Sequence, residues 1–277
     1  MSGDVDPLYI AARATLLDAL DALADHRTSI ILVGAQAIYI HTGDVDIAVA
    51  PFTADGDLAL DPRQLGSQPA LEAAMQARGF TLKQDQVGIW TGERRVEANI
   101  ITIDLLVPDS LGGPGSRGAR LEGHDYRAAR KVRGIEGCLV DKSIVRISSL
   151  EPRDQRVFDI DVAGPAALLV SKCHKLAERL AESRPRRVKP KDAYDVLRIL
   201  RGVALGNLLA GFSTMARDEV SRETAATGLE HLQSLFGRPR LAGSNLAAHA
   251  AAGLEDETTV RESCVALTGD LIEGLGR

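Results

Sequence analysis

The stretch Ile100–Val107, with the sequence IITIDLLV, is the most hydrophobic of the segments that have a strand pattern, and it contains one acidic residue, Asp104. A continuous apolar run of this length predicts a buried strand. A carboxylate inside such a strand loses its hydration, which is costly unless it is ion-paired or ligates a metal. Asp104 therefore either faces water at a strand end or belongs to a functional site, and we favour the second interpretation.

The segments on both sides of this strand alternate between strand and helix patterns. Helices are expected over residues 4–25, 34–41, 69–78, 165–183 and 192–201. Further strands are expected over residues 29–33, 47–50, 58–60, 80–82 and 87–91, near Leu139, and over 145–147. This alternation predicts an α/β (α+β) fold with a small mixed sheet. Because no strand pattern follows Gly202, we place domains at residues 1–202 and 203–277, the second of them helical.

Composition narrows the class of protein further. The 277 residues carry 38 acidic against 33 basic side chains, a net charge of −5, and 45% are hydrophobic. This is the balance of a folded globular protein. No apolar run reaches the roughly 18–20 residues of a membrane span, and Met1–Leu8 has no basic signal region, so we expect a cytoplasmic protein with no membrane partner. Three scattered cysteines argue against a disulfide or zinc framework.

Two acidic pairs are candidates for a metal site together with Asp104. Residues i and i+2 of a strand point to one face, so an Asp-x-Asp pattern presents two carboxylates together. The pairs are Asp55 with Asp57 and Asp44 with Asp46. We favour Asp55 and Asp57, because the residues around them suit a strand entering a sheet, whereas Asp44 follows a turn-like His-Thr-Gly. A third carboxylate on a neighbouring strand would complete a Mg²⁺ or Mn²⁺ site of the kind used in phosphoryl transfer.

A helix pair farther along the chain carries a second group of charges. Lys172, Lys175 and Arg179 share one face of the helix expected over 165–183, and at least one of them would reach triphosphate oxygens. Asp192 and Asp195 lie one turn apart on the next helix and are able to pair with these cations. The alternative is a solvated surface for the cations, which we favour for Lys175 and Arg179, and a favourable helix-terminal charge for Asp192. We weigh the two interpretations evenly for Asp192 and favour the structural one for Asp195.

The order of these motifs resembles the nucleotidyltransferase superfamily that includes DNA polymerase β. The shared features are Leu32-Val33-Gly34, the segment Thr53–Leu58, and the Asp in an apolar strand. The later segments Ser171–Arg179 and Lys191–Leu197 are similar to one branch, the abortive-infection-type nucleotidyltransferase toxins of type IV toxin–antitoxin systems, which include mycobacterial toxins. The chain has Gly34-Ala35 where that branch has Gly-Ser or Gly-Gly.

This resemblance implies a role for each matching residue. It assigns catalysis to Asp55, Asp57, Lys172 and Asp192, and metal binding to Asp55, Asp57 and Asp104. It assigns nucleotide binding to Gly34, Thr53, Lys172 and Lys175. It also implies a polymerase β-like fold, NTP and Mg²⁺ (or Mn²⁺) as ligands, the 3′ end of tRNA as acceptor, a translation-blocking toxin activity and a cognate antitoxin.

Two basic clusters are consistent with a polyanionic partner. The first is Arg117, Arg120, Arg127, Arg130, Lys131 and Arg133, and the second is Arg184, Arg186, Arg187, Lys189 and Lys191. Each phosphate that such a cluster neutralises releases counterions. Aromatic residues for base stacking are scarce near them. The alternatives to tRNA modification are a nucleotidyltransferase that modifies a protein or a small molecule of the antibiotic type, and an inactive nucleotide-binding regulator.

Overall fold

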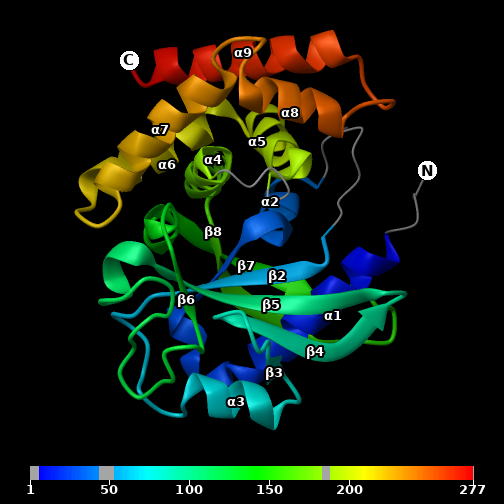
Figure 1. The fold of residues 1–277 in the computed structure, drawn as a ribbon, viewed down its shortest axis with the longest axis vertical. Helices are drawn as coiled ribbons and strands as arrows, with labels where there is room; N and C mark the ends of the chain where they lie inside the picture. The colour runs from blue at the N-terminus through cyan, green and yellow to red at the C-terminus, as the bar shows by residue number, and fades with distance from the viewer. Residues whose placement is uncertain (1–5, 44–52, 183–187, 277) are drawn as a thin grey trace. The chain divides into compact units, whose positions relative to one another are not determined.

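The computed structural model describes residues 6–43, 53–182 and 188–276 and divides into two compact units (Figure 1). Unit 1 comprises Met1–Ala37, Pro51–Val132 and Lys142–Ala163, and unit 2 comprises Ile38–Ala50, Arg133–Asp141 and Gly164–Arg277. Each unit is described by itself below. The boundary expected after residue 202 falls inside unit 2.

A mixed sheet forms the centre of unit 1. Within the described residues its order is β3-β4-β5-β2-β1-β8-β7, and β6 pairs with β5. The strands are β1 (Ile30–Val33), β2 (Asp55–Leu60), β3 (Thr81–Leu82), β4 (Ile89–Val96), β5 (Asn99–Pro108), β6 (Arg130–Val132), β7 (Lys142–Ser148) and β8 (Val157–Ala163). The β2–β5, β5–β6 and β1–β8 pairs are parallel, and the others are antiparallel. Strand β1 is wholly buried, and so is most of β5. Both coincide with apolar runs of the sequence, which is the pattern expected for central strands.

Helix α1 (Pro7–Ala22) contacts β2, β4 and β5. The carboxylate of Asp6 caps its first turn by accepting from the Leu8 amide at 2.7 Å, and Pro7 occupies the first helical position, where a missing N–H costs nothing. Leu16 is fully buried, and such a leucine stabilises the fold by about 1.5–3 kcal/mol. A Cβ on Gly56 of β2 would lie 3.6 Å from the Leu16 Cβ, so the side of β2 that alternates with Asp55 and Asp57 faces α1.

The described residues of unit 1 also contain short helical segments. These are η1 (Ala24–Ser29), α3 (Leu71–Ala77) and η2 (Asp109–Leu111).

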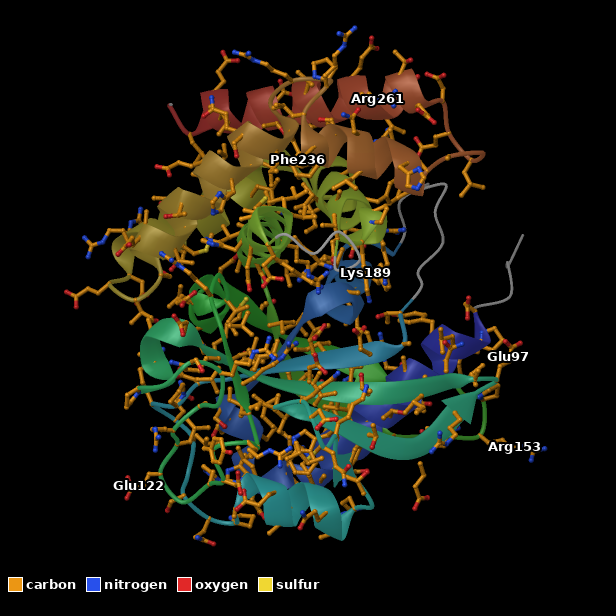
Figure 2. All side chains as sticks on the ribbon, viewed as in Figure 1. Glu97, Glu122, Arg153, Lys189, Phe236 and Arg261 are labelled. Atoms are coloured by element: carbon orange, nitrogen blue, oxygen red, sulfur yellow. The ribbon has the colours of Figure 1, made fainter. Side chains whose placement is uncertain are left out.

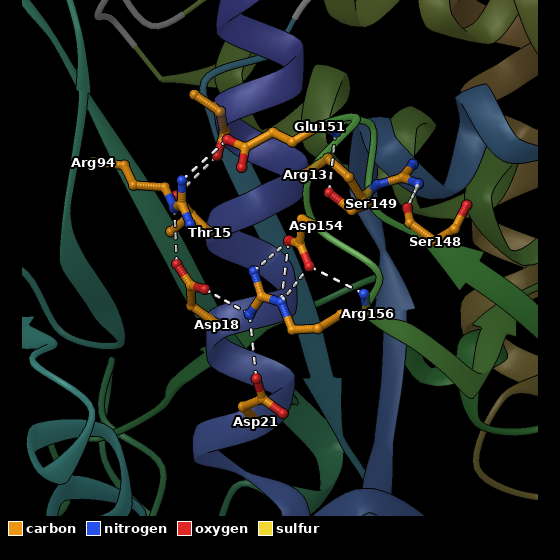
Figure 3. A network of polar contacts seen from close by, with 11 residues as sticks. Arg13, Thr15, Asp18, Asp21, Arg94, Ser148, Ser149, Glu151, Asp154 and Arg156 are labelled. Atoms are coloured by element: carbon orange, nitrogen blue, oxygen red, sulfur yellow. Dashed lines mark hydrogen bonds and ion pairs between the residues drawn. The ribbon is translucent and has the colours of Figure 1, made fainter.

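A network of ion pairs fastens the segment between β7 and β8 to α1 (Figure 3). The guanidinium of Arg156 donates to Asp154 at 2.7 Å, to Asp18 at 2.7 Å and to Asp21 at 3.2 Å. Arg94 of β4 bridges Asp18 and Glu151. The pKa of Arg156 is raised, first by its hydrogen bond to Asp154. Because the network draws on three elements, it holds α1 in place on the sheet.

Unit 2 is helical within its described residues. Its helices are α4 (Pro165–Ala181), α5 (Pro190–Gly202), α6 (Leu205–Arg217), α7 (Arg222–Phe236), α8 (Ala242–Ala250) and α9 (Glu257–Gly274), with η3 (Glu136–Leu139). Helix α4 packs against α5, α6 and α7, and α8 packs against α5 and α9. Phe236 is fully buried, whereas the Glu122 and Arg153 side chains of unit 1 point outward (Figure 2). Helix α2 (Gly34–Thr42) begins in unit 1 and ends in unit 2.

These elements confirm the predicted fold class, a mixed α/β sheet with helices followed by a helical C-terminal part. Some details of the sequence analysis were wrong. The segment at Leu139 is the 3₁₀ helix η3 and not a strand, and neither β6 nor β8 was expected. The strand expected over residues 47–50 lies outside the described residues. Cys138, Cys173 and Cys264 form no disulfide.

No single helix in the described parts of the chain has the length and apolar character to cross a membrane, although α5 and α6, bent by 111° at their junction, together meet the criteria of length and composition.

Candidate active site

Strand register brings the three predicted metal ligands to one face of the sheet. In the parallel β2–β5 pair, Asp57 stands opposite Asp104 and Asp55 stands opposite Thr102. Paired residues point to the same face, and so do residues i and i+2 of one strand. Asp55, Asp57 and Asp104 therefore share a face. Asp44 and Asp46, the alternative pair, lie outside the described residues.

Gly34 lies directly against Asp57. It follows β1, whose last residue, Val33, pairs with Asp57, and it adopts a positive φ of 70°. A Cβ at this position would come within 2.0 Å of the Asp57 Oδ2, far inside van der Waals contact. Both the left-handed backbone and the close approach require glycine here. The predicted nucleotide-binding residue Gly34 thus adjoins the carboxylate face.

Hydrogen bonds from neighbouring residues fix both the side chain and the backbone carbonyl of Asp55. The buried Thr53 hydroxyl donates to the Asp55 Oδ1. The Gln36 Nε2 donates to the Asp55 carbonyl at 3.2 Å, and the Gln36 Oε1 accepts from the Arg13 Nε at 3.0 Å. Gln36 and Arg13 are buried, so this chain of hydrogen bonds is shielded from water. It connects α1 and α2 to the first residue of β2.

Asp104 is buried and ion-paired to an arginine of the adjacent strand. The Arg130 Nη2 donates to the Asp104 Oδ2 at 2.5 Å. Arg130 pairs with Leu106 in the parallel β5–β6 ladder, so it lies on the same face as Asp104. The sequence interpretation that Asp104 is buried and partnered, rather than solvated at a strand end, agrees with this geometry.

The three carboxylates have the chemistry of a divalent-cation site. Hard carboxylate oxygens are the ligands that Mg²⁺ and Mn²⁺ prefer. As the side chains stand, Asp55 is engaged by Thr53 and Asp104 by Arg130, and among the described residues no three Asp, Glu, His or Cys side chains already converge as a metal cage. The donor set therefore fits a divalent ion, provided that Asp104 exchanges its guanidinium partner.

The predicted lysine cluster is a buried ion-pair network between α4 and α5 of unit 2. The Lys172 Nζ lies 2.9 Å from the Asp192 Oδ1 and 2.7 Å from the Asp195 Oδ2. The Lys175 Nζ lies 3.0 Å from the Asp192 Oδ1, and the Arg179 Nη1 lies 2.6 Å from the Asp192 Oδ2. The structure thus brings together the Lys172 and Asp192 that the resemblance pairs.

Charges in this network determine the protonation states. Burial opposes the charge of Lys172, but Asp192 and Asp195 outweigh it and hold its pKa well above the usual value. Burial likewise opposes ionisation of Asp192, but Lys172, Lys175 and Arg179 hold its pKa well below the usual value. Lys172 and Asp192 are therefore both ionised at neutral pH. Lys175, with 40% of its side chain exposed, is the most accessible of the three cations.

Several residues of these two clusters were not expected from the sequence. Asp195, for which we favoured a structural role, is 1% exposed and pairs with Lys172. Its spacing of three residues from Asp192 was a usable signal. Arg13 and Gln36 are single polar residues in apolar helical segments, which is the only trace of their role in the sequence.

Three members of the first basic cluster donate to backbone carbonyls of nearby loops. Arg120 donates to the Pro114 carbonyl, Arg127 to the Lys83 and Gln84 carbonyls, and Lys131 to the Gly113 carbonyl. Carbonyls bind the arginine donors without neutralising their charge, whereas Lys131 is also ion-paired with Asp109 at 3.5 Å. In the second cluster, Arg184, Arg186 and Arg187 lie outside the described residues, and the Lys191 Nζ lies 5.7 Å from the centroid of the Tyr39 ring.

Comparison with known proteins gives matches among solved structures. A scan against protein-family models and a search of curated proteins give no match. The antibiotic-resistance factor ANT(2″)-Ia aligns with a TM-score of 0.39 and 11% identity, over 79% of this chain and 96% of that chain. A protein from H. pylori described as a candidate nucleotidyltransferase aligns with a TM-score of 0.38 and 10% identity, over 98% of both chains. JHP933 from Helicobacter pylori aligns with a TM-score of 0.32 and 11% identity, over 99% of this chain and 95% of that chain.

Proposed function

We propose that the protein is a metal-dependent nucleotidyltransferase whose metal ligands are Asp55, Asp57 and Asp104. The observation that carries this proposal is the β2–β5 register, which sets Asp57 opposite Asp104 and puts Asp55 on the same face. Three carboxylates on adjacent strands form the minimal ligand set for the metal ions of phosphoryl transfer. A buried carboxylate in the most apolar strand is costly to the fold; the ion pair with Arg130 offsets part of that cost, and a bound metal would offset it as well.

In the proposed reaction an acceptor hydroxyl oxygen bonds to the α-phosphorus of an NTP. The bond from that phosphorus to the bridging oxygen breaks, pyrophosphate leaves, and the hydroxyl proton passes to solvent. A bound divalent cation would supply positive charge for the triphosphate and acidify the acceptor hydroxyl. The chain's own residues fix the carboxylates: Thr53 orients the Asp55 side chain, Gln36 holds its backbone, and Gly34 leaves room for Asp57.

For unit 2, we propose that Lys172 and Lys175 bind nucleotide phosphate and that Asp192 positions them. The ion pairs among the described residues gather three cations around Asp192 and Asp195, and such a cluster suits an anionic ligand. Lys175 is the exposed member and therefore the one that meets phosphate at least cost in desolvation. Substitution Lys175→Gln is expected to weaken nucleotide binding without loss of folding.

The proposed acceptor is the 3′ end of tRNA, and the proposed biological role is that of a toxin silenced by a cognate antitoxin. The resemblance in motif order supports this proposal, together with the arginine-rich loop whose charges remain unneutralised by the carbonyls they contact. In an expression host, growth arrest by the wild-type chain that Asp57→Asn abolishes would agree with the toxin role. Equal growth with both chains would contradict it.

Label transfer tests the activity directly. The purified chain is incubated with Mg²⁺, each labelled NTP in turn and total tRNA, and label on tRNA is measured. Wild-type transfer that Asp57→Asn abolishes is expected. Asp85→Asn, at an exposed turn residue, is the matched control and should transfer label normally. Label on protein or on a small molecule would overturn the tRNA acceptor, and no transfer from any NTP would overturn the activity.

A further inference from the structure

Arg130 is the residue of the carboxylate face that the proposed mechanism leaves without a role. It occupies the first position of β6, and its guanidinium pairs with Asp104 at 2.5 Å. The Asp104 side chain is 9% exposed, against 34% for Arg130, so the pair has its anion inside and its cation toward the surface. A positive group thus already sits where the metal would bind its third ligand.

The guanidinium is incompletely satisfied in this position. Its Nε is buried and has no hydrogen-bond acceptor among the described residues. A buried donor without an acceptor costs the free energy of its lost hydration. Other members of the same basic cluster differ, since Arg127 donates to backbone carbonyls of the turn between β3 and β4 and Lys131 donates to a carbonyl of its own loop. Arg130 therefore has donor capacity that the described protein atoms do not use.

Charge balance explains why an arginine belongs here while no metal is bound. Asp57 and Asp104 stand opposite each other, with Asp55 on the same face, so three carboxylates gather at one place. Without a cation they repel one another and raise the cost of folding. A guanidinium offsets that repulsion without a metal, but it then competes with the metal for Asp104.

We propose that Arg130 is a nucleotide-binding residue that exchanges partners. It pairs with Asp104 while the metal site is empty, and it donates to the polyphosphate of the NTP once Asp104 has turned to the metal. A guanidinium is suited to both partners, because its planar donors match carboxylate and phosphate oxygens equally well. This inference rests on the proposed nucleotidyltransferase function and assigns Arg130 a substrate contact within it.

The exchange predicts effects of opposite sign on the two ligands when Arg130 is replaced. In Arg130→Gln the metal no longer competes with a guanidinium, so Mn²⁺ alone should bind at least about threefold more tightly. The polyphosphate loses a charged donor, so an unreactive NTP analogue with Ca²⁺ should bind about tenfold more weakly. If Arg130 had a purely structural role, its replacement would lower the affinity for both ligands together.

Calorimetric titration of the full chain measures both affinities, and thermal unfolding with and without Mn²⁺ supplies a readout independent of nucleotide. Arg130→Gln should be less stable than wild type without metal and should gain more from Mn²⁺. Arg127→Gln is the matched control, an arginine of the same loop that contacts backbone carbonyls, and it should change neither affinity. If Arg130→Gln does not fold, Arg130→Lys replaces it, with the same expectations at smaller magnitude.

The role of Arg130 would be overturned if its variant bound both ligands more weakly than wild type, or if it bound the NTP analogue with wild-type affinity. Either result would leave the proposed function standing. A wild-type chain that binds Mn²⁺ but no NTP analogue would instead overturn the proposed function, and the Arg130 proposal with it.

Discussion

At the scale of single residues, the carboxylate face depends on a close approach between Asp57 and position 34, where only glycine fits. Asp57 occupies the space in which any residue other than glycine at position 34 would place its Cβ. This proximity explains why a strand followed directly by Gly34 and an Asp-x-Asp pair occur together in the chain. The glycine is therefore a condition for the geometry of the site as well as for the turn.

Substitution Gly34→Ala should lower both stability and activity. The left-handed backbone alone costs a non-glycine residue about 1–2 kcal/mol. In addition the new methyl group must displace the Asp57 carboxylate, so nucleotide transfer should fall at least about tenfold. Urea unfolding and label transfer measure the two effects.

Gly253→Ala provides the matched control for this substitution. Gly253 has a similar φ of 80° but open space where its Cβ would lie. It should therefore show the backbone penalty without loss of activity. Equal activity of the two variants would contradict the close approach at Asp57.

His124 should make stability depend on pH. Its Nδ1 accepts from the Leu71 amide at 3.1 Å and its Nε2 contacts the Gly66 carbonyl at 3.0 Å, a pattern that only the neutral ring with a proton on Nε2 satisfies. Burial, above all, holds the pKa of His124 below the usual value of 6.5. The unfolded chain thus binds the proton more readily than the folded chain. The contribution of neutral His124 to the free energy of unfolding is complete above about pH 6.5 and is lost as the pH falls through the folded-state pKa.

Urea midpoints at pH 7.5 and pH 5.5 measure this dependence. His174 and His231 also have lowered pKa values, mainly through burial, and contribute in the same direction. The difference between wild type and His124→Gln isolates the share of His124, and the variant should lose less stability on acidification. An identical loss in both chains would exclude His124 as a contributor.

At the scale of secondary-structure elements, sequence patterns predicted the strands whose environment is uniform. The wholly buried β1 was recognisable as an apolar run, as was β5. Strand β8 was missed because Asp159 and Asp161 alternate with its apolar residues, and cross-strand ion pairs to Arg146 and Lys142 make these acids compatible with a sheet. The apolar residues near Leu139 suggested a strand, but they form η3, with the buried Glu136 accepting from the Gly134 amide.

The candidate site was predictable in composition but not in connectivity. The spacing of Asp55 and Asp57 indicated a shared face, and the apolar surroundings singled out Asp104. Their juxtaposition depends on register between strands separated along the chain, which local patterns do not encode. The same holds for Arg130, which is one of the six residues of the first basic cluster and becomes distinct only through the β5–β6 register.

The hydrogen-bond chain from α1 through α2 to β2 should control the geometry of the metal ligands. Gln36→Glu keeps a partner for Arg13 but replaces the donor to the Asp55 carbonyl with a carboxylate oxygen. The loss of this buried hydrogen bond should cost about 1–3 kcal/mol of stability. Because the first residue of β2 then loses an anchor, Mn²⁺ affinity should also fall.

Calorimetry on the folded variant measures this effect, and Gln84→Glu, at an exposed position, is the control. Wild-type Mn²⁺ affinity in Gln36→Glu would show that the chain of hydrogen bonds stabilises the fold without positioning Asp55.

At the scale of the whole molecule, the two candidate clusters belong to different compact units. The carboxylate face lies in the sheet of unit 1, and the ion-pair network joins two helices of unit 2. The net charge of −5 is distributed unevenly, because acids gather at the proposed metal face and basic residues gather in the loop before β6. This distribution opposes broad electrostatic binding to long nucleic acids but permits a local contact with one RNA end.

The division into units predicts that damage to the ion-pair network leaves metal binding intact. Asp195→Asn removes one of the two carboxylates around the buried Lys172 ammonium, so stability should fall by about 1–3 kcal/mol, since Asp192 still pairs with Lys172. Mn²⁺ affinity, measured by calorimetry below the unfolding temperature, should equal that of wild type because all three proposed ligands lie in unit 1. The Asp57→Asn variant should lose Mn²⁺ binding and leave the ion-pair network of unit 2 unchanged.

Loss of Mn²⁺ binding in folded Asp195→Asn would contradict the assignment of the metal site to unit 1 alone.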